Sequence, residues 1–133
     1  MDVRIAGTFY SCGPRLREEG VYGRAVSRFI AQALASQPIT VYGDGTQTRS
    51  FCYKTDAAIG LLLLLANEGA RGGVVNVGNP EEVTILELAQ RIRKLTGSAS
   101  PITFHPLSED DPRRRCPDVG RVERLLGWKQ KIP

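Results

Sequence analysis

Strand-like and helix-like patterns alternate along the whole chain, and this alternation constrains the fold more than any other feature. Val3–Phe9 and Ile39–Tyr42 are apolar runs of the length and composition of short buried strands. Arg24–Ser36 repeats apolar residues at the spacing of an amphipathic helix, and Thr84 with Glu87 forms a capping box that opens another helix. The alternation predicts an α/β fold in which helices pack on a sheet.

Two local patterns give sharper predictions. Asp-Gly within Gly43–Gly45 supplies the positive φ angles of a tight turn, so we expect a hairpin between Ile39–Tyr42 and Thr48–Tyr53. Asp56 is placed to cap a helix over Ala57–Ala66. Because the apolar run of that helix is unbroken, we expect it to be buried on nearly all sides.

Size and composition indicate an ordinary soluble globular domain. The chain has 133 residues, of which 41% are hydrophobic and 24% charged, so one domain is expected. Its net charge of +4 favours anionic ligands but falls short of a nucleic-acid-binding surface. The longest apolar stretch is far shorter than a bilayer span, so we expect no membrane partner. Three widely separated cysteines indicate neither a zinc site nor a disulfide framework, and we expect a cytoplasmic protein.

The sequence lacks the patterns of dinucleotide binding and of the common catalytic sites. The chain's 14 glycines form neither GxGxxG nor GxxGxxG, the spacing that admits a pyrophosphate at a helix N-terminus. No tyrosine is followed four residues later by lysine, the pairing in which an ammonium group lowers the pKa of a phenol. A nucleophilic triad would depend on the lone His105, which is more often structural. We therefore expect no catalytic, cofactor-binding or metal-binding residue in this chain.

Several segments taken together resemble one family. They are Gly13-Pro14-Arg15, Gly23-Arg24-x-Val26-Ser27-x-Phe29-Ile30, Thr40-Val41-Tyr42-Gly43-x-Gly45-x-Gln47-Thr48-Arg49-x-Phe51-x-Tyr53, Val77-Gly78-Asn79-Pro80-Glu81-Glu82-x-Thr84-Ile85-Leu86-Glu87, Asp110-Asp111-Pro112-x-x-Arg115-x-Pro117-Asp118 and Leu126-Gly127-Trp128. This set resembles the UDP-glucuronic acid decarboxylases, or UDP-xylose synthases, of the extended short-chain dehydrogenase/reductase group. The similarity extends over essentially the whole chain.

The resemblance implies both a fold and an activity. Such enzymes hold NAD on an N-terminal Rossmann domain, oxidise the sugar, release the carboxylate as CO2 and reduce the keto intermediate. By resemblance, residues 1–15 correspond to the last Rossmann strand and its loop, and residues 16–133 to the UDP-sugar-binding lobe. We expect one partial domain, incomplete at both ends, that binds no cofactor alone. The helices of the family dimer lie in the missing half.

The resemblance also assigns binding roles. Arg49 and Arg115 match arginines that grip the diphosphate of the nucleotide sugar, and a guanidinium offers a planar donor fork suited to phosphate oxygens. Val41 and Tyr42 match positions that cradle the uracil, and Arg24 matches a loop arginine that reaches toward the ligands. Without the resemblance, Arg49 would be read as an exposed strand residue and the arginine run near Arg115 as a solvated patch.

Departures from the family pattern keep a second hypothesis open. Gly7, Tyr10 and Cys12 replace a usual arginine, asparagine and tyrosine, and Lys54 replaces a usual valine. Because tyrosine is bulkier than asparagine, it is expected to fill the pocket that asparagine lines. The first hypothesis is a UDP-sugar-binding lobe with weak binding and no decarboxylation alone, paired with a separate Rossmann half. The second is a non-enzymatic, partner-binding or structural module. Nucleic-acid binding through Arg113–Arg115 is a distant third.

Overall fold

Within the residues that the structure describes, the fold combines short strands, mostly paired in parallel, with four α-helices, as the alternation of patterns predicts. The computed structural model describes residues 2–16, 25–107 and 111–132. Contacts group the chain into two compact units built from interleaved segments. Unit 1 contains Met1–Gly13, Ser50–Glu82 and Arg115–Pro133, and unit 2 contains Pro14–Arg49 and Val83–Arg114. The domain division expected from the sequence stays a prediction.

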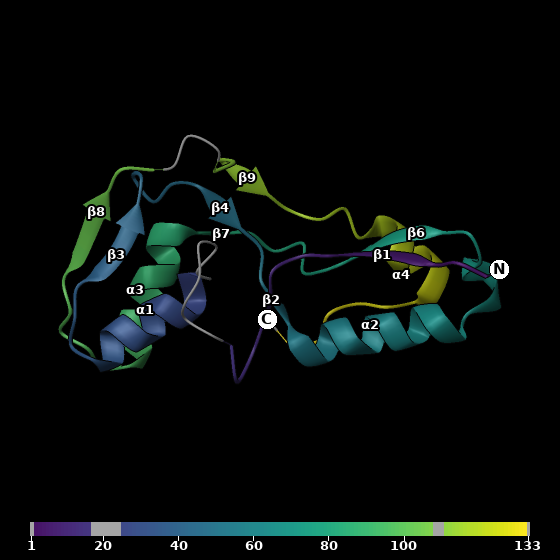
Figure 1. The fold of residues 1–133 in the computed structure, drawn as a ribbon, viewed down its shortest axis with the longest axis horizontal. Coiled ribbons are helices and arrows are strands. Elements are labelled where there is room, and N and C mark those ends of the chain that lie inside the picture. Colours follow the sequence, from purple (N-terminus) through teal and green to yellow (C-terminus); the bar gives the residue numbers. More distant parts are fainter. Residues whose placement is uncertain (1, 17–24, 108–110, 133) are drawn as a thin grey trace. The chain divides into compact units, whose positions relative to one another are not determined.

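Unit 1 is built on a pair of parallel strands. β1 (Ile5–Thr8) pairs in parallel with β6 (Val74–Val77), and Figure 1 shows the two strands side by side. Two shorter strands, β2 (Ser11–Cys12) and β5 (Cys52–Tyr53), form a second parallel pair. The prediction of a strand within Val3–Phe9 is confirmed, but its expected burial is wrong, because Ile5 is 53% exposed.

The helices of unit 1 pack around a core that includes Trp128. The helices are α2 (Lys54–Ala66), α4 (Gly120–Leu126) and the short 3-10 helix η1 (Glu68–Ala70), and both α2 and α4 contact β6. Gly60 of α2 allows a close approach, because an added Cβ would lie 2.8 Å from Val77 and 3.2 Å from the Trp128 ring. The buried side chains of this core are Cys52, Ala57, Leu64, Ala70, Val75, Val77, Val119, Val122 and Trp128.

Two predictions for α2 are wrong. Asp56 does not cap the helix, since α2 begins at Lys54 and its N-cap is Tyr53. Instead the buried Asp56 carboxylate accepts hydrogen bonds from the backbone N–H groups of Lys131 and Ile132, both at 2.9 Å. Nor is the helix buried on nearly all sides, because five of its large apolar side chains remain exposed: Ile59, Leu61, Leu62, Leu63 and Leu65.

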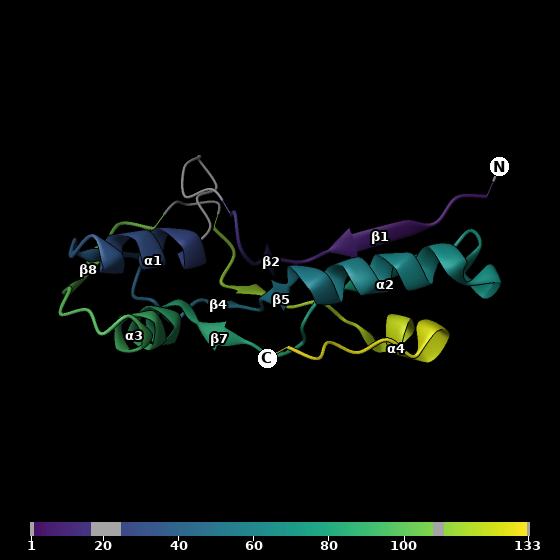
Figure 2. The same cartoon turned by 90° about the horizontal axis from the view of Figure 1, so that it is seen from below.

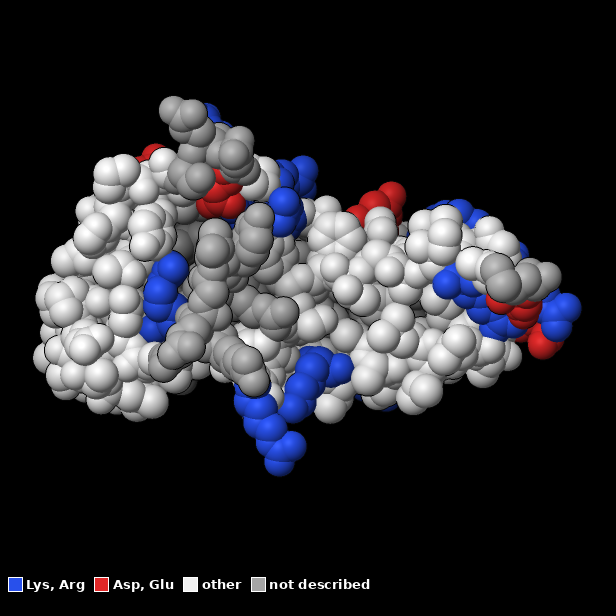
Figure 3. Space-filling model, in the orientation of Figure 1, with Lys and Arg blue, Asp and Glu red and all other residues white. Residues whose placement is uncertain are grey.

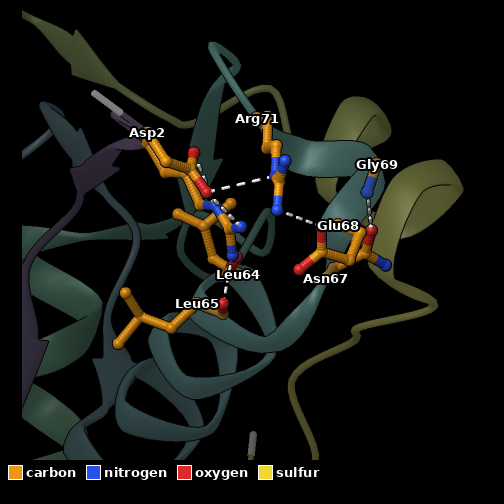
Figure 4. Close-up of polar contacts among 8 residues, drawn as sticks. Asp2, Leu64, Leu65, Asn67, Glu68, Gly69 and Arg71 are labelled. Carbon is orange, nitrogen blue, oxygen red and sulfur yellow. Dashed lines mark hydrogen bonds and ion pairs between the residues drawn. The ribbon is translucent and has the colours of Figure 1, made fainter.

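A cluster of charged residues closes the C-terminal end of α2. Arg4 donates to the carbonyl oxygen of Leu64 at 2.9 Å and to the Asp2 carboxylate at 2.7 Å, which satisfies helix carbonyls that lack an intrahelical partner. Arg71 bridges Asp2 and Glu68, and Figure 4 shows it between these two carboxylates. In Figure 3 the red and blue atoms intermix at this end of the unit. Arg4 therefore ties the start of the chain to α2.

Unit 2 packs two helices against a second pair of parallel strands. α1 (Ala25–Leu34) and α3 (Ile85–Leu95) lie side by side in both Figure 1 and Figure 2. β3 (Ile39–Tyr42) pairs in parallel with β8 (Ile102–His105). The core consists of Phe29, Ala33, Ile39, Val41, Ile85, Ala89 and Ile92. The predicted capping box is confirmed in part, because the Thr84 hydroxyl accepts from the Glu87 N–H at 3.1 Å.

The predicted hairpin is wrong. β4 (Thr48–Arg49) pairs not with β3 but antiparallel with β7 (Val83–Thr84), and it lies between β7 and β9 (Arg114–Arg115). Gly43 and Gly45 do adopt positive φ angles of 72° and 77°. The turn therefore connects two different sheets, because β3 pairs with β8 and β4 pairs with β7.

Candidate functional site

Arg49 is a buried arginine held by a carboxylate. Its side chain lies in β4 of unit 2 with 5% of its surface exposed. One terminal nitrogen donates to the Asp111 carboxylate at 2.5 Å, and the other donates to the carbonyl oxygen of Thr48 at 2.7 Å. These bonds fix the plane of the guanidinium group, and the aspartate compensates its charge. Arg49 is therefore buried within unit 2, whereas the local sequence, taken without the family resemblance, predicts an exposed strand residue.

Asp111 is a partner that sequence reasoning did not single out. It stands 62 residues after Arg49 and was noted only as part of the Asp-Asp-Pro segment. A backbone bond from Thr48 N–H to the Arg113 carbonyl oxygen, at 2.9 Å, brings that segment alongside β4. The sequence showed a carboxylate next to a proline, but no pattern near Asp111 indicated that it would pair with Arg49.

Arg115 is an exposed arginine held by a phenol. It belongs to unit 1, and its Nη1 donates to the Tyr10 hydroxyl oxygen at 3.1 Å. Its Cζ also lies 5.9 Å from the centroid of the Tyr10 ring, within the range of a cation–π contact. Arg115 is thus accessible to an anion, and it is hydrogen-bonded to Tyr10, a residue that departs from the family pattern.

The loop after β6 organises the surroundings of Arg115. Asn79, which is buried, donates to the carbonyl oxygen of Phe51 at 3.1 Å and accepts from the Glu81 N–H at 2.9 Å and the Gln130 amide at 3.1 Å. The Phe51 ring in turn meets the Tyr10 ring edge-on at 6.0 Å. These contacts make the loop a support of the Tyr10 neighbourhood.

Val41 and Tyr42 lie next to each other in β3 but have different surroundings. The Val41 side chain is fully buried in the core of unit 2, and its backbone lies in the parallel ladder with β8. Tyr42 is 42% exposed, and its ring centroid lies 4.9 Å from Cζ of Arg28 and 6.0 Å from the His105 ring. An exposed aromatic ring beside a cation is a surface on which a flat heterocycle can stack. Arg24 lies outside the described residues.

Arg28 is a second residue that sequence reasoning missed. Its Nη2 donates to the carbonyl oxygen of Thr40 at 3.4 Å, and its Nε is buried without a hydrogen-bond partner. Burial lowers the pKa of this guanidinium below its ordinary value, and the neighbouring Tyr42 opposes that shift. The sequence pattern of α1 did not single out Arg28, because only the apolar residues around it were used to predict the helix.

Gly78 does not have the open surroundings of a phosphate-binding glycine. Gly78 follows a parallel strand, as a phosphate-binding glycine would, but an added Cβ there would lie 2.8 Å from Cγ of Pro117 and 3.1 Å from Cβ of Phe9. The next helix, α3, begins only at Ile85. The space above Gly78 is therefore filled by protein.

Other site chemistries find little support in the part of the chain that the structure describes. Residues 2–16, 25–107 and 111–132 contain no cluster of three side chains suited to a metal ion. Among the same residues, no helix has the length and apolar character needed to cross a membrane. Lys and Arg on the face drawn in Figure 3 stand in small separate groups rather than in a continuous stripe.

Comparison with known proteins identifies the family. The model of the NAD dependent epimerase/dehydratase family matches residues 1–78, which is more than half of the chain. The chain belongs to this family. UDP-glucuronic acid decarboxylase 4 of Arabidopsis thaliana is 46% identical over 132 residues, which are 99% of this chain and 29% of that relative. UDP-glucuronic acid decarboxylase 1 of Danio rerio is 46% identical over 133 residues, with 100% and 31% covered.

A solved structure shares the fold of this chain. UDP-glucuronic acid 4-epimerase from Bacillus cereus, in complex with UDP-glucuronic acid and NAD, matches with a TM-score of 0.90 and 29% identity. The match covers 100% of this chain and 41% of the epimerase. The family resemblance and the α/β fold expected from the sequence are therefore confirmed. The chain spans less than a third of the two decarboxylases named above, so the activity of a whole relative is not transferred to it directly.

Proposed function

We propose that this chain is the nucleotide-sugar-binding part of a UDP-glucuronate decarboxylase-like protein and that it does not decarboxylate alone. The observation that carries the proposal is Arg115, an exposed guanidinium at the position that the family resemblance assigns to the diphosphate. Arg49, the second arginine that the resemblance assigns to the diphosphate, is buried and already paired with Asp111, so its main contribution would be to hold the fold of unit 2.

The uridine part of the ligand would be bound by other residues than those that bind its diphosphate. The exposed ring of Tyr42 offers an aromatic surface, and the Arg28 guanidinium lies over the same ring. Val41 would position this surface rather than contact the uracil, because its side chain is buried and its backbone lies in the ladder with β8. A uracil ring stacks on such surfaces through its π face and is fixed by hydrogen bonds at its edge.

Titration of the full chain with UDP and UMP tests the binding proposal. We expect UDP to bind more tightly than UMP, because only UDP carries the second phosphate. Arg115→Gln should weaken UDP binding about tenfold while changing UMP binding less, as expected for loss of one charge-assisted hydrogen bond. Arg113→Gln is the matched control, since Arg113 is an exposed arginine two residues away without an assigned role. Equal effects of the two substitutions would contradict a specific diphosphate contact.

A second observation supports a partner that supplies the Rossmann half. The apolar face of α2 exposes Leu62 to 65% and Leu65 to 68%, and Ile5 of β1 is 53% exposed. Parallel sheets are normally covered on both faces, and a two-stranded sheet is rarely stable alone. We propose that α2 and β1 dock onto a half that carries NAD and further parallel strands, on a segment or chain outside these 133 residues.

Complementation tests the partner proposal. The chain should release no CO2 from UDP-glucuronate alone, and should do so when combined with the NAD-binding half of a plant UDP-glucuronic acid decarboxylase. Leu62→Glu with Leu65→Glu should abolish this complementation, because two charges would be buried at the contact. The control is Glu81→Gln, an exposed substitution in the same unit. Activity that survives the double substitution would place the docking surface elsewhere.

The exposed apolar face of α2 also favours the alternative of a non-enzymatic, partner-binding or structural module. Such a face on a protein without ligand binding would serve self-association or a protein partner. Light scattering after size exclusion separates the two hypotheses. A chain that self-associates through α2 and does not respond to UDP would support the alternative, whereas a UDP-binding monomer would exclude it.

A further inference from the structure

Tyr10 holds the arginine to which the diphosphate is assigned. Its hydroxyl oxygen accepts a hydrogen bond from Arg115 Nη1 at 3.1 Å, and its ring lies beneath the same guanidinium at 5.9 Å. Tyr10 lies between β1 and β2, whereas Arg115 stands 105 residues later. The contact therefore depends on how the two segments are packed rather than on their closeness in sequence.

Gly78 explains why the two segments meet. An added Cβ at this position would lie 2.8 Å from Pro117 and 3.1 Å from Phe9, so Phe9 and Pro117 approach each other across the bare glycine. Phe9 N–H donates to the Val77 carbonyl oxygen at 3.2 Å. Phe9 directly precedes Tyr10 and Pro117 follows Arg115 by two residues. Packing at Gly78 thus fixes the position of both members of the pair.

The backbone of Tyr10 is held in an unfavourable conformation. Its φ angle is 31°, on the positive side that bulky residues rarely adopt and that asparagine tolerates better. The Cys52 N–H donates to the Tyr10 carbonyl oxygen at 3.2 Å, and the Phe51 ring meets the Tyr10 ring at 6.0 Å with an interplanar angle of 64°. Such strain persists only where surrounding contacts enforce it, and it is common at functional sites.

We propose that Tyr10 competes with ligand phosphate for Arg115 and thereby lowers the affinity of the chain for diphosphates. A neutral phenol oxygen is a weaker acceptor for a guanidinium than an anionic phosphate oxygen, so a diphosphate can displace it. The ligand then gains only the difference between the two contacts. This inference rests on the proposed function, because it takes Arg115 as a phosphate-binding residue. Tyr10 is thus an affinity-determining residue of that site.

The test compares Tyr10→Phe with the unmodified full chain, using inorganic pyrophosphate and UDP as probes. Tyr10→Phe keeps the ring over Arg115 and removes only the competing oxygen. We expect both probes to bind about two- to five-fold more tightly, the range of one exposed charge-assisted contact. Tyr10→Asn, which removes ring and hydroxyl together, should increase affinity at least as much. Tyr53→Phe removes a phenol hydroxyl from β5 of the same unit and should change neither affinity.

A second set of variants tests whether the effect of Tyr10→Phe depends on Arg115. In an Arg115→Gln background, Tyr10→Phe should have no effect on pyrophosphate binding, because there is no longer a guanidinium to compete for. A persistent gain in that background would overturn the inference. Weaker or unchanged binding by Tyr10→Phe in the unmodified chain would also overturn it, since Tyr10 would then orient Arg115 or be irrelevant to it. Circular dichroism and the melting temperature of each variant show whether the fold is intact.

The two probes separate failure of this inference from failure of the proposed function. If Tyr10→Phe tightens pyrophosphate binding through Arg115 but UDP never binds better than pyrophosphate, the competition stands and the nucleotide-binding function fails. If UDP binds better than pyrophosphate but Tyr10→Phe changes neither, the function stands and the competition fails. If no variant binds either probe, both fail, because removal of the competing hydroxyl has exposed no anion site.

Discussion

The two arginines that the family resemblance selects are held in opposite ways. Arg49 lies in unit 2 with 5% of its side chain exposed and is bound to the carboxylate of Asp111 at 2.5 Å. Arg115 lies in unit 1, is exposed, and is bound to the neutral hydroxyl of Tyr10 at 3.1 Å. A carboxylate compensates a positive charge, whereas a phenol accepts a hydrogen bond and leaves the charge uncompensated.

This difference separates a structural contribution from a binding one. A buried arginine paired with a carboxylate contributes to stability, because removal of either partner leaves a polar group without its hydrogen bonds. An exposed arginine on a phenol adds little to stability, but its charge remains available to an anion. We therefore expect substitutions of Arg49 to act mainly on folding and substitutions of Arg115 mainly on binding.

Arg49→Gln should have the largest effect on stability. The glutamine side chain is shorter and uncharged, so Asp111 loses its ion pair and the buried space of the guanidinium is left partly unfilled. We expect a loss of about 3 kcal/mol in the free energy of unfolding, measured by urea denaturation. Arg49→Lys should recover part of the loss, because lysine keeps the charge but not the two-pronged geometry. If Arg49→Gln destabilises the chain no more than the substitution of an exposed arginine does, Arg49 does not have the structural role that distinguishes it from Arg115.

Gly78→Ala should be the next largest effect, and it should act on unit 1. The added methyl group meets Pro117 and Phe9 at 2.8 and 3.1 Å, and both belong to the segments that carry Arg115 and Tyr10. We expect a loss of about 2 kcal/mol from overpacking, measured by urea denaturation. In the Gly78→Ala background, Tyr10→Phe should no longer tighten pyrophosphate binding, because the added methyl group has already separated Tyr10 from Arg115. Gly69→Ala is the control, because its methyl group would meet only the Asn67 side chain, at 3.2 Å.

Patterns within a few residues were predicted well from the sequence. The bounds of β3 match the predicted strand at Ile39–Tyr42, and α1 and α3 lie where apolar spacing and the Thr84 cap place them. These elements depend on local signals: side-chain period, a capping hydroxyl and a glycine at the helix end. Gly97, with a φ of 63°, lies directly after Thr96, the C-cap of α3.

Features that depend on distant partners were not predictable in the same way. The hairpin failed because β3 pairs with β8, some sixty residues further along, and a turn pattern carries no information about that partner. The apolar run of α2 signalled burial, but it does not say whether the covering surface belongs to these residues. In the site, the family resemblance supplied Arg49 and Arg115, while their partners Asp111 and Tyr10 became apparent only from the contacts.

Alkaline pH should weaken unit 1 selectively. The chain's cysteines, at positions 12, 52 and 116, all belong to that unit. Burial, with a smaller contribution from Asp56, raises the pKa of Cys52 from an ordinary 9.0 to about 11. Between these values the unfolded chain loses the thiol proton while the folded chain keeps it, so stability is full below pH 9 and falls as the pH rises toward 11. At pH 10 the loss should reach about 1.4 kcal/mol.

Trp128 fluorescence measures this effect, because the chain's single tryptophan is buried in the core of unit 1. Amide exchange of α3 follows unit 2 in the same samples. Cys52→Ala should remove most of the alkaline loss, and Cys116→Ala should leave it in place. Equal alkaline loss in the two units would show that they unfold together, and the two arginines would then have to be compared within one cooperative structure.

Arg115→Gln should have the smallest effect on stability, and this small effect completes the comparison. The substitution removes one exposed hydrogen bond to Tyr10 and a cation–π contact at 5.9 Å, neither of which is shielded from water. We expect the free energy of unfolding to change by less than about 0.5 kcal/mol in urea denaturation, while UDP affinity falls. Arg49→Gln should show the reverse balance. If Arg115→Gln instead destabilises the fold as strongly as Arg49→Gln, the phenol contact is a structural bond, and Arg115 is not held in reserve for a ligand.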